Sequence, residues 1–255
     1  GNQMMLDFRQ QAERFGADLR DGVIVKADLG QAPYTLTTDE GHTVKADTVI
    51  IATGASAKYL GLADEEKYKG EGVSACATCD GFFYRKKTVA VVGGGDTACE
   101  EALYLASLAK KVYMIVRKPF LRASDVMQKR VKETENIEIL FEHNTLGLFG
   151  DNGVEGVRLV KRKGEADEQV YELPIDGFFL AIGHKPNSDV FKPWLDTDET
   201  GYIITEGDST RTKVPGVFAA GDVADPHYRQ AVTAAASGCR AAIEADRYLR
   251  EQGII

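Results

Sequence analysis

The sequence lacks several features that would place it in a specialised class of protein. Its 255 residues contain no run approaching the roughly 18–20 consecutive apolar residues of a membrane-spanning helix. No basic cluster is present, and the net charge is −8 with a pI of about 5.2, so we expect neither nucleic acid nor a membrane as a partner. Four cysteines are too few for a secreted disulfide scaffold.

The chain is also poor in metal ligands and in the usual signals of an N-terminus. It opens Gly-Asn-Gln-Met-Met with no targeting segment, so we expect the true N-terminus to be missing. Cys99 and Cys239 each stand alone in an expected helix, where we expect both to be buried. The four histidines show no ligand spacing, and no metal site is expected. They are His42, His143, His184 and His227.

The hydrophobic pattern predicts an α/β protein with two modules, one inserted in the other. Continuous β-branched runs, such as 48–52 and 88–92, are typical of strands buried on both faces. Helical spacing recurs between them, and short extended segments are separated by Gly, Pro and Asp. The expected helices are 4–15, 96–109, 124–134 and 228–250; the expected strands include 48–52, 88–92, 111–116, 137–141, 177–182 and 217–220, with an antiparallel meander between 137–141 and 177–182 and a hairpin-like segment at 201–204.

A glycine-rich turn lies between the strand 88–92 and the helix that follows it. Gly93, Gly95 and Ala98 form the pattern Gly-x-Gly-x-x-Ala. The first glycine permits the tight turn, the second lets the backbone approach a pyrophosphate, and the small third residue lets the helix pack closely. The pattern in this context predicts a dinucleotide site, although a turn without a ligand is the simpler alternative.

Cations follow the next strand, at the place where an NAD site carries an acidic residue. Arg117, Lys118 and Arg122 stand there without a carboxylate. Guanidinium groups suit a 2′-phosphate, so this placement favours NADPH over NADH. A solvated basic turn is the alternative.

The pair Cys76 and Cys79, in Cys-Ala-Thr-Cys-Asp, is the sharpest feature of the sequence. A zinc site would need a second half, which is absent. A purely structural bridge over so short a loop would restrain little unfolded-chain entropy. A redox dithiol remains, in which one sulfur of lowered pKa reacts and the other resolves the mixed disulfide. Asp80 would donate and accept protons beside them.

Gly221 and Asp222 follow the strand 217–220 and precede the last helix. The carboxylate could hydrogen-bond a ribose or polyol, and the helix start could stabilise negative charge on a bound ring. An ordinary Asp-capped turn is the alternative.

Together these motifs resemble the low-molecular-weight, bacterial-type thioredoxin reductases. The resemblance extends over essentially the whole chain, and the dithiol between two dinucleotide modules is its most specific part. It is carried by residues 52–55 (Ala-Thr-Gly-Ala), 76–83 (Cys-Ala-Thr-Cys-Asp-Gly-Phe-Phe), 93–98, 181–187, 219–223 and 228–231.

The resemblance implies a cytoplasmic, homodimeric flavoenzyme that passes electrons from NADPH to FAD, to a Cys76–Cys79 disulfide and then to thioredoxin. Cys79 would face the flavin, Cys76 would attack thioredoxin and Asp80 would act as the acid. Two Rossmann-like modules are implied: an FAD module at 1–56 and 187–255, and an NADPH module at 57–186 inserted in it. The implied NADPH residues are Gly93, Gly95, Asp96, Thr97, Ala98, Arg117, Lys118, Arg122, Ile182 and Gly183; the implied FAD residues are Thr53, Gly54, Gly221, Asp222, Arg229, Gln230 and Ala231.

The chain departs from the family pattern in two places. Near the 2′-phosphate the family has His-Arg-Arg, where this chain has Val116, Arg117 and Lys118, which weakens bidentate recognition. The family's N-terminal Gly-x-Gly-x-x-Gly unit for the FAD pyrophosphate does not occur in these residues, so we expect a fragment of a reductase. The alternatives are a flavoprotein subunit of a peroxide-reducing system, which usually uses NADH, and a non-catalytic NADPH-binding protein.

Overall fold

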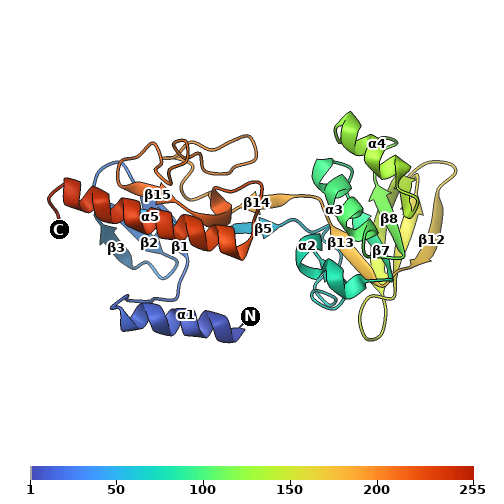
Figure 1. Ribbon diagram of the computed structural model, residues 1–255, viewed down its shortest axis with the longest axis horizontal. Coiled ribbons are helices and arrows are strands. Elements are labelled where there is room, and N and C mark those ends of the chain that lie inside the picture. The colour runs from blue at the N-terminus through green and yellow to red at the C-terminus, as the bar shows by residue number, and fades with distance from the viewer. Residues whose placement is uncertain (1) are drawn as a thin grey trace. The chain divides into compact units, whose positions relative to one another are not determined.

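The computed structural model describes residues 2–255, which divide into two compact units. Unit 1 combines the chain up to Ala55 with Pro186–Ile255, and unit 2 is Ser56–Lys185. The chain therefore leaves unit 1 once, builds all of unit 2 and returns (Figure 1). Each unit has core clusters made only of its own residues.

Unit 2 is built around a five-stranded sheet in which every neighbouring pair of strands is parallel. The register places Gly177 opposite Val89, Val89 opposite Val112, and Val112 opposite Ile137. All carboxyl ends of the strands consequently meet at one edge. In spatial order the strands are β6 (Val73–Ser74), β13 (Gly177–Leu180), β7 (Thr88–Val92), β8 (Lys111–Val116) and β9 (Ile137–Phe141).

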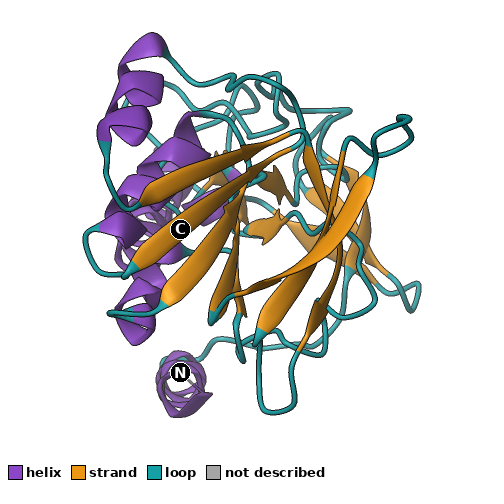
Figure 2. Cartoon of the chain, turned by 90° about the vertical axis from the view of Figure 1, so that its right-hand side faces the viewer, coloured by secondary structure: helices purple, strands orange, loops and turns teal. Residues whose placement is uncertain are grey.

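Helices cover one face of this sheet and an antiparallel meander covers the other (Figure 2). Side chains alternate between the faces of a strand. Val89 and Val91 of β7 therefore pack against the helices, whereas Ala90 and Val92 pack against the meander. Burial on both faces explains why β7 is a continuous apolar run. The covering elements are α3 (Asp96–Ala106) and α4 (Asp125–Glu133) on one side and β10 (His143–Phe149), β11 (Gly156–Lys161) and β12 (Gln169–Pro174) on the other.

Unit 1 contains an antiparallel three-stranded sheet and a parallel pair of strands. The core lies between them and includes Leu29, Ile51, Phe191 and Val217. The carboxyl ends of the parallel strands again lie at one edge, which brings residues after position 51 near those after 219. The elements are α1 (Asn2–Arg14), β1 (Ile24–Asp28), β2 (Tyr34–Thr38), β3 (Thr43–Ala46), β4 (Val49–Ile51), β15 (Val217–Ala219), the 3-10 turn η2 (Gly221–Val223) and α5 (Ala231–Glu251).

The two crossings between the units are short strands that pair with each other. β5 (Ala55–Ala57) leads out of unit 1 and β14 (His184–Pro186) leads back, and together they form a two-stranded sheet. Just beyond them, the Lys58 amide donates to the Gly183 carbonyl at 3.0 Å. The ends of unit 2 are thus held side by side.

Four sequence-based expectations were wrong in detail. Ile50, expected to be buried on both sides of its strand, is 40% exposed, because the face of β4 that carries it is uncovered. Ile203 forms only an isolated bridge to Thr197 instead of a hairpin strand. The last helix begins at Ala231, because Arg229 has a positive φ of 48° that a helix cannot include. Cys239, expected to be buried, is exposed on α5.

Within residues 2–255, no helix is long and apolar enough to cross a membrane. The same residues hold no group of three or more His, Cys, Asp or Glu side chains arranged for a metal ion.

Candidate functional site

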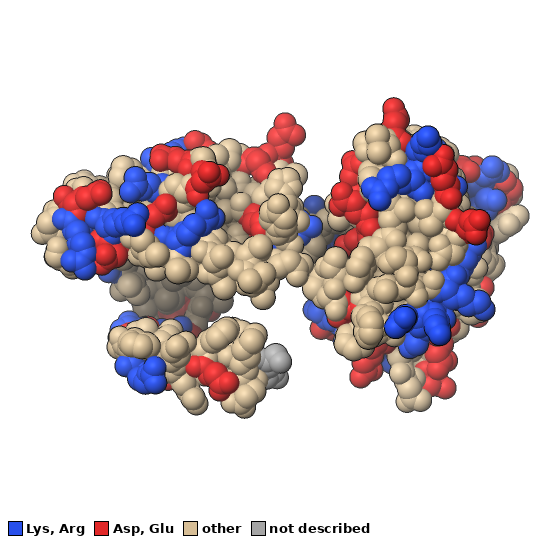
Figure 3. Space-filling model, viewed as in Figure 1, with Lys and Arg blue, Asp and Glu red and all other residues tan. Residues whose placement is uncertain are grey.

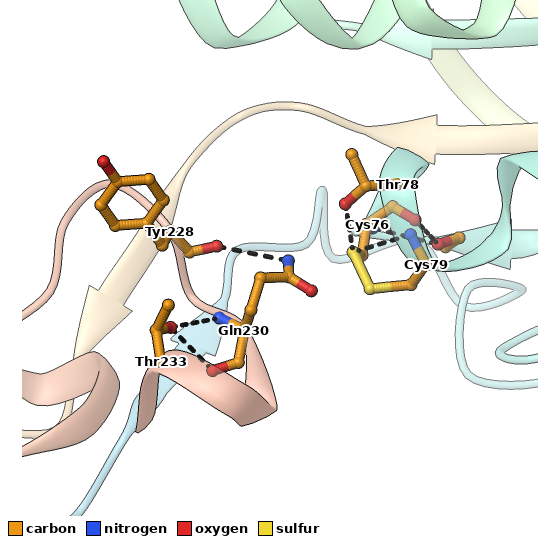
Figure 4. The surroundings of a disulfide bond; sticks show 7 residues. Cys76, Thr78, Cys79, Tyr228, Gln230 and Thr233 are labelled. Carbon is orange, nitrogen blue, oxygen red and sulfur yellow. Dashed lines mark hydrogen bonds between the residues drawn. A yellow bond between two sulfur atoms is a disulfide. The ribbon is translucent and has the colours of Figure 1, made fainter. Parts of the chain in front are cut away.

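Cys76 and Cys79 form a disulfide at the start of the short helix α2 (Ala77–Asp80) in unit 2 (Figure 4). The Ser74 hydroxyl accepts the Cys76 amide hydrogen at 3.0 Å, and the Cys79 amide donates to the Cys76 sulfur at 3.2 Å. The Thr78 hydroxyl lies 3.4 Å from the same sulfur. Cys79 is exposed and Cys76 is half-buried, so the bond is open to an incoming reagent.

Directly after the disulfide come an acidic residue, Asp80, and two exposed aromatic residues, Phe82 and Phe83. The amide of half-buried Asp80 donates to the Cys76 carbonyl at 3.1 Å. Phe82 and Phe83, in the turn η1 (Gly81–Tyr84), are 64% and 71% exposed. Exposed aromatic side chains beside a reactive group are typical of surfaces that bind a protein.

A cavity of about 780 Å³ lies at the carboxyl edge of the parallel sheet in unit 2. Its wall is formed by the residues that follow β13, β7, β8 and β9. Open parallel sheets bind their ligands at this edge. All ten residues predicted for NADPH except Ala98 line it, and Ala98 is fully buried behind the glycine-rich turn.

The two predicted glycines of the turn differ in what surrounds them. A Cβ on Gly93 would lie 2.5 Å from the Ala181 carbonyl oxygen and 2.8 Å from the Ala98 Cβ, and the φ of Gly93 is +143°. A Cβ on Gly95 would meet nothing within 4 Å, although Gly95 lines the cavity. Gly93 is therefore required by the fold, whereas Gly95 leaves an open approach to the backbone from the cavity.

Asp96 begins α3 and its carboxylate is engaged by the neighbouring loop. The Ser124 amide and hydroxyl donate to the same Asp96 oxygen at 3.0 and 2.7 Å. These hydrogen bonds, the amide's first, lower the pKa of Asp96. Asp96 therefore ties the start of α3 to the loop that carries Arg122.

The cations predicted for the 2′-phosphate lie at one end of the cavity. Arg117, Lys118 and Arg122 are exposed and line it, and the Arg122 amide donates to the Gly94 carbonyl at 2.7 Å. Among residues 2–255 none of the three forms an ion pair with a carboxylate. Their charges are therefore available to an anion.

Sequence reasoning missed part of the cavity wall. Residues after β9 could have been included, because the carboxyl end of every parallel strand lies at the same edge. The loop after β5 had no such signal. The missed residues include Leu60, Leu62, Phe120, His143, Asn144 and Thr145.

The predicted FAD residues of unit 1 lie in three segments. The Thr53 hydroxyl donates to the Asn187 carbonyl at 2.7 Å, and the Asn187 amide donates to the Gly54 carbonyl at 2.9 Å. The Gly221 amide donates to the Ser237 hydroxyl at 2.8 Å, which fixes η2 against α5. Because β4 and β15 are parallel, Thr53–Gly54 and Gly221–Asp222 follow strand ends at one edge.

Asp222 and the start of α5 supply the polar groups of this edge. Burial, and then the charge of Asp225, raises the pKa of half-buried Asp222, whereas Arg229 lowers it. The Thr233 hydroxyl accepts the Gln230 amide hydrogen at 3.3 Å and donates to the Gln230 carbonyl at 2.9 Å, while the Gln230 side-chain amide donates to the Tyr228 carbonyl (Figure 4). Asp225 accepts hydrogen bonds from the amides of residues 227–229. Ala231 is the first residue of the helix.

Comparison with known proteins identifies the class to which this fold and these sites belong. The family profile of the pyridine nucleotide-disulphide oxidoreductases matches residues 9–238, so the chain belongs to that family. Within it, the chain belongs to the thioredoxin reductases, as three relatives illustrate.

Thioredoxin reductase of Coxiella burnetii is 50% identical over 258 residues, which cover 98% of this chain and 79% of the relative. The mitochondrial thioredoxin reductase of Kluyveromyces lactis is 45% identical over 256 residues, or 98% and 73% of the two chains. The structure of thioredoxin reductase from Giardia duodenalis matches with a TM-score of 0.90 and 41% identity, covering 98% of this chain and 81% of that one. The expected fold class and family are confirmed.

Proposed function

We propose that this chain carries the NADPH-dependent thioredoxin-disulfide reductase chemistry of its family, with Cys76, Cys79 and Asp80 as the reacting groups. The observation that carries the proposal is an exposed disulfide in the same unit as a cavity with a glycine-rich turn and unpaired cations. We propose residues 56–185 as the NADPH module and the two flanking segments as the FAD module.

The cavity of unit 2 fits NADPH. Gly95 offers open backbone for a pyrophosphate, because a side chain there would point into empty space. Arg117, Lys118 and Arg122 would hold the 2′-phosphate, and their free charges favour NADPH over NADH. This preference speaks against a peroxide-reducing, NADH-linked flavoprotein.

Unit 1 fits part of FAD. Asp222 offers a carboxylate to hydroxyl groups of the ribityl chain, and Arg229, Gln230 and Ala231 would lie along the ring at the start of α5. The described residues of unit 1 include no glycine-rich strand–turn–helix for the pyrophosphate. Bound FAD would supply the two electrons that reduce the Cys76–Cys79 disulfide.

The reduced dithiol then performs the exchange with thioredoxin. The Cys76 thiolate attacks one sulfur of the thioredoxin disulfide, and the released thioredoxin thiolate takes a proton for which Asp80 is the donor. Cys79 then gives its proton to the Asp80 carboxylate and, as a thiolate, attacks the Cys76 sulfur of the mixed disulfide. The Cys76–Cys79 bond re-forms and the second thioredoxin thiolate leaves. The Cys79 amide hydrogen bond to the Cys76 sulfur would stabilise the Cys76 thiolate.

The surface beside the disulfide suits a protein substrate. Phe82 and Phe83 would provide apolar contact area around the reacting sulfurs. Arg85, Lys86 and Lys87 follow directly and are exposed, although the chain as a whole is acidic. We infer from the family assignment alone that the enzyme is a cytoplasmic homodimer; sedimentation of the purified protein tests the dimer.

A single-turnover experiment tests the dithiol without any flavin. The chain is reduced with dithiothreitol, freed of reductant and mixed with oxidised thioredoxin. We expect one thioredoxin dithiol per chain, none with Cys76→Ser, and a trapped mixed disulfide with Cys79→Ser. Asp80→Asn should slow the exchange about 10²–10⁴-fold.

Cys239→Ser is the matched control, because Cys239 is also exposed but lies on α5. It should behave as wild type. Undiminished thioredoxin reduction by Cys76→Ser would refute the proposed chemistry.

A further inference from the structure

The cavity is lined by the glycine-rich turn and also by the segment between Lys58 and Glu65, which forms a separate part of its wall. Leu60 and Leu62 line the cavity, yet the segment has no regular secondary structure before the turn that begins at Ala63. At its start, the Lys58 amide donates to the Gly183 carbonyl at 3.0 Å. At its end, the Glu65 amide donates to the Leu62 carbonyl at 3.2 Å.

The carboxylate of Glu65 holds this wall in place. Glu65 is only 3% exposed. Its Oε1 accepts the Leu60 amide hydrogen at 2.9 Å, and its Oε2 accepts those of Gly61 and Leu62 at 2.8 and 3.0 Å. In the described part of the chain, Glu65 forms no ion pair. A buried charge is tolerated only with such hydrogen bonds, and charge-assisted bonds are the stronger kind.

The order of the strands indicates which part of a nucleotide this wall faces. Along the sheet the order is β13, β7, β8, β9, so residues 181–183 flank the glycine-rich turn on one side and Arg117 and Lys118 flank it on the other. With the 2′-phosphate at the cations and the pyrophosphate at the turn, the nicotinamide half extends toward 181–183. The hydrogen bond between Lys58 and Gly183 places the wall at that end.

We propose that Glu65 is a positioning residue for the nicotinamide half of NADPH: by binding three consecutive backbone amides it fixes Leu60 and Leu62 against that half of the nucleotide. This rests on the proposed NADPH site of unit 2. Without the carboxylate, three backbone amides lose their acceptor and the wall is free to move away from the ligand. The adenosine half, bound at the other end, is unaffected.

Two ligands separate this role from general stability. Adenosine 2′,5′-bisphosphate has the 2′-phosphate but no nicotinamide, whereas NADPH has both. We expect Glu65→Gln and Glu65→Ala to weaken NADPH by about tenfold or more in calorimetric titration, while the affinity for adenosine 2′,5′-bisphosphate stays within about twofold of wild type. Gln keeps the shape of Glu and one accepting oxygen, so Glu65→Gln should lose less NADPH affinity than Glu65→Ala.

Glu66→Gln is the matched control, because the neighbouring Glu66 side chain is 86% exposed and pairs with Lys69 at the surface. It should bind both ligands as wild type does. Leu62→Ala removes part of the wall itself and should show the same selective loss of NADPH. Should Glu65→Ala fail to fold, Glu65→Gln and Leu62→Ala decide the question.

The outcomes distinguish this proposal from the function on which it rests. If wild type binds both ligands but the variants lose both equally, or lose neither, then Glu65 has no selective role and the proposal is overturned. A wild-type chain that binds neither ligand would overturn the NADPH site itself, and this proposal with it.

Discussion

Cys99 lies fully buried in α3, packed in the core of unit 2. Burial, followed by the charges of Asp96 and Glu100, raises the pKa of its thiol to about 11. A cysteine in an unfolded chain has a pKa of about 8.5. Between these two values the unfolded thiol ionises while the folded thiol stays protonated, which favours the unfolded state.

The contribution of Cys99 to stability should therefore be complete below about pH 8.5 and should be lost as the pH rises toward 11. We expect the free energy of unfolding in urea to fall between pH 8 and pH 10.5 by a larger amount in wild type than in Cys99→Val, which cannot ionise. Equal decreases in the two proteins would show that Cys99 does not titrate differently in the folded chain.

Arg117 and Arg122 give a second prediction for single residues. Replacing either with Ala should weaken NADPH roughly 10- to 100-fold, because each charge-assisted contact to a phosphate contributes about 1.5–3 kcal/mol. NADH, which lacks the 2′-phosphate, should bind as before. Equal losses of the two nucleotides, measured by fluorescence titration, would mean that these arginines only support the fold.

In the turn between β7 and α3, one glycine is needed for folding and another for binding. Gly93→Ala would place its Cβ against the Ala181 carbonyl in a strained conformation, so we expect a lower melting temperature. Gly95→Ala meets no protein atom and should melt as wild type, yet bind NADPH more weakly because the new methyl group occupies the backbone approach. Melting curves and NADPH titrations of both variants test this; wild-type affinity in Gly95→Ala would contradict it.

The elements also show how far sequence can predict this fold. The strands of unit 2 were predictable, because burial on both faces leaves continuous apolar runs such as Val89–Val92. The start of α5 was not, because the positive φ of Arg229 comes from local hydrogen bonding to Asp225 that no propensity reveals.

The same distinction holds for the site. The glycine-rich turn, the cations after β8 and the dithiol are contiguous motifs whose chemistry can be recognised in the sequence. Leu60 and His143 are 83 residues apart in number and reach the cavity only through the folded sheet, so periodicity could not identify them. The roles of the individual residues predicted for NADPH and FAD stay predictions until variants are measured.

At the scale of the whole molecule, the two units should differ in how well they hold their nucleotides. Unit 2 has a complete cavity with a glycine-rich turn, whereas the described residues of unit 1 offer Asp222 and the start of α5 but no such turn. The 255-residue chain should therefore bind NADPH but purify with little flavin, because the main anion site for the FAD pyrophosphate is not among these residues.

The visible absorption spectrum of protein whose mass is verified as 27.8 kDa measures this directly. Figure 3 shows Lys and Arg side chains gathered on part of unit 2, but they do not replace a pyrophosphate site in unit 1, since each nucleotide is expected in its own unit. Stoichiometric yellow flavin in that sample would show that the residues present suffice.

The paired strands β5 and β14 have a consequence for how such a protein can be assembled and altered. Because they are neighbours in a sheet, the two ends of unit 2 lie about 4.8 Å apart across the hydrogen bonds. A host fold can accept a guest domain at a single surface loop when the guest begins and ends at one place. Residues 56–185 meet that condition, so the gene segment that encodes them could be exchanged between related reductases as one piece, carrying the cavity and the disulfide together.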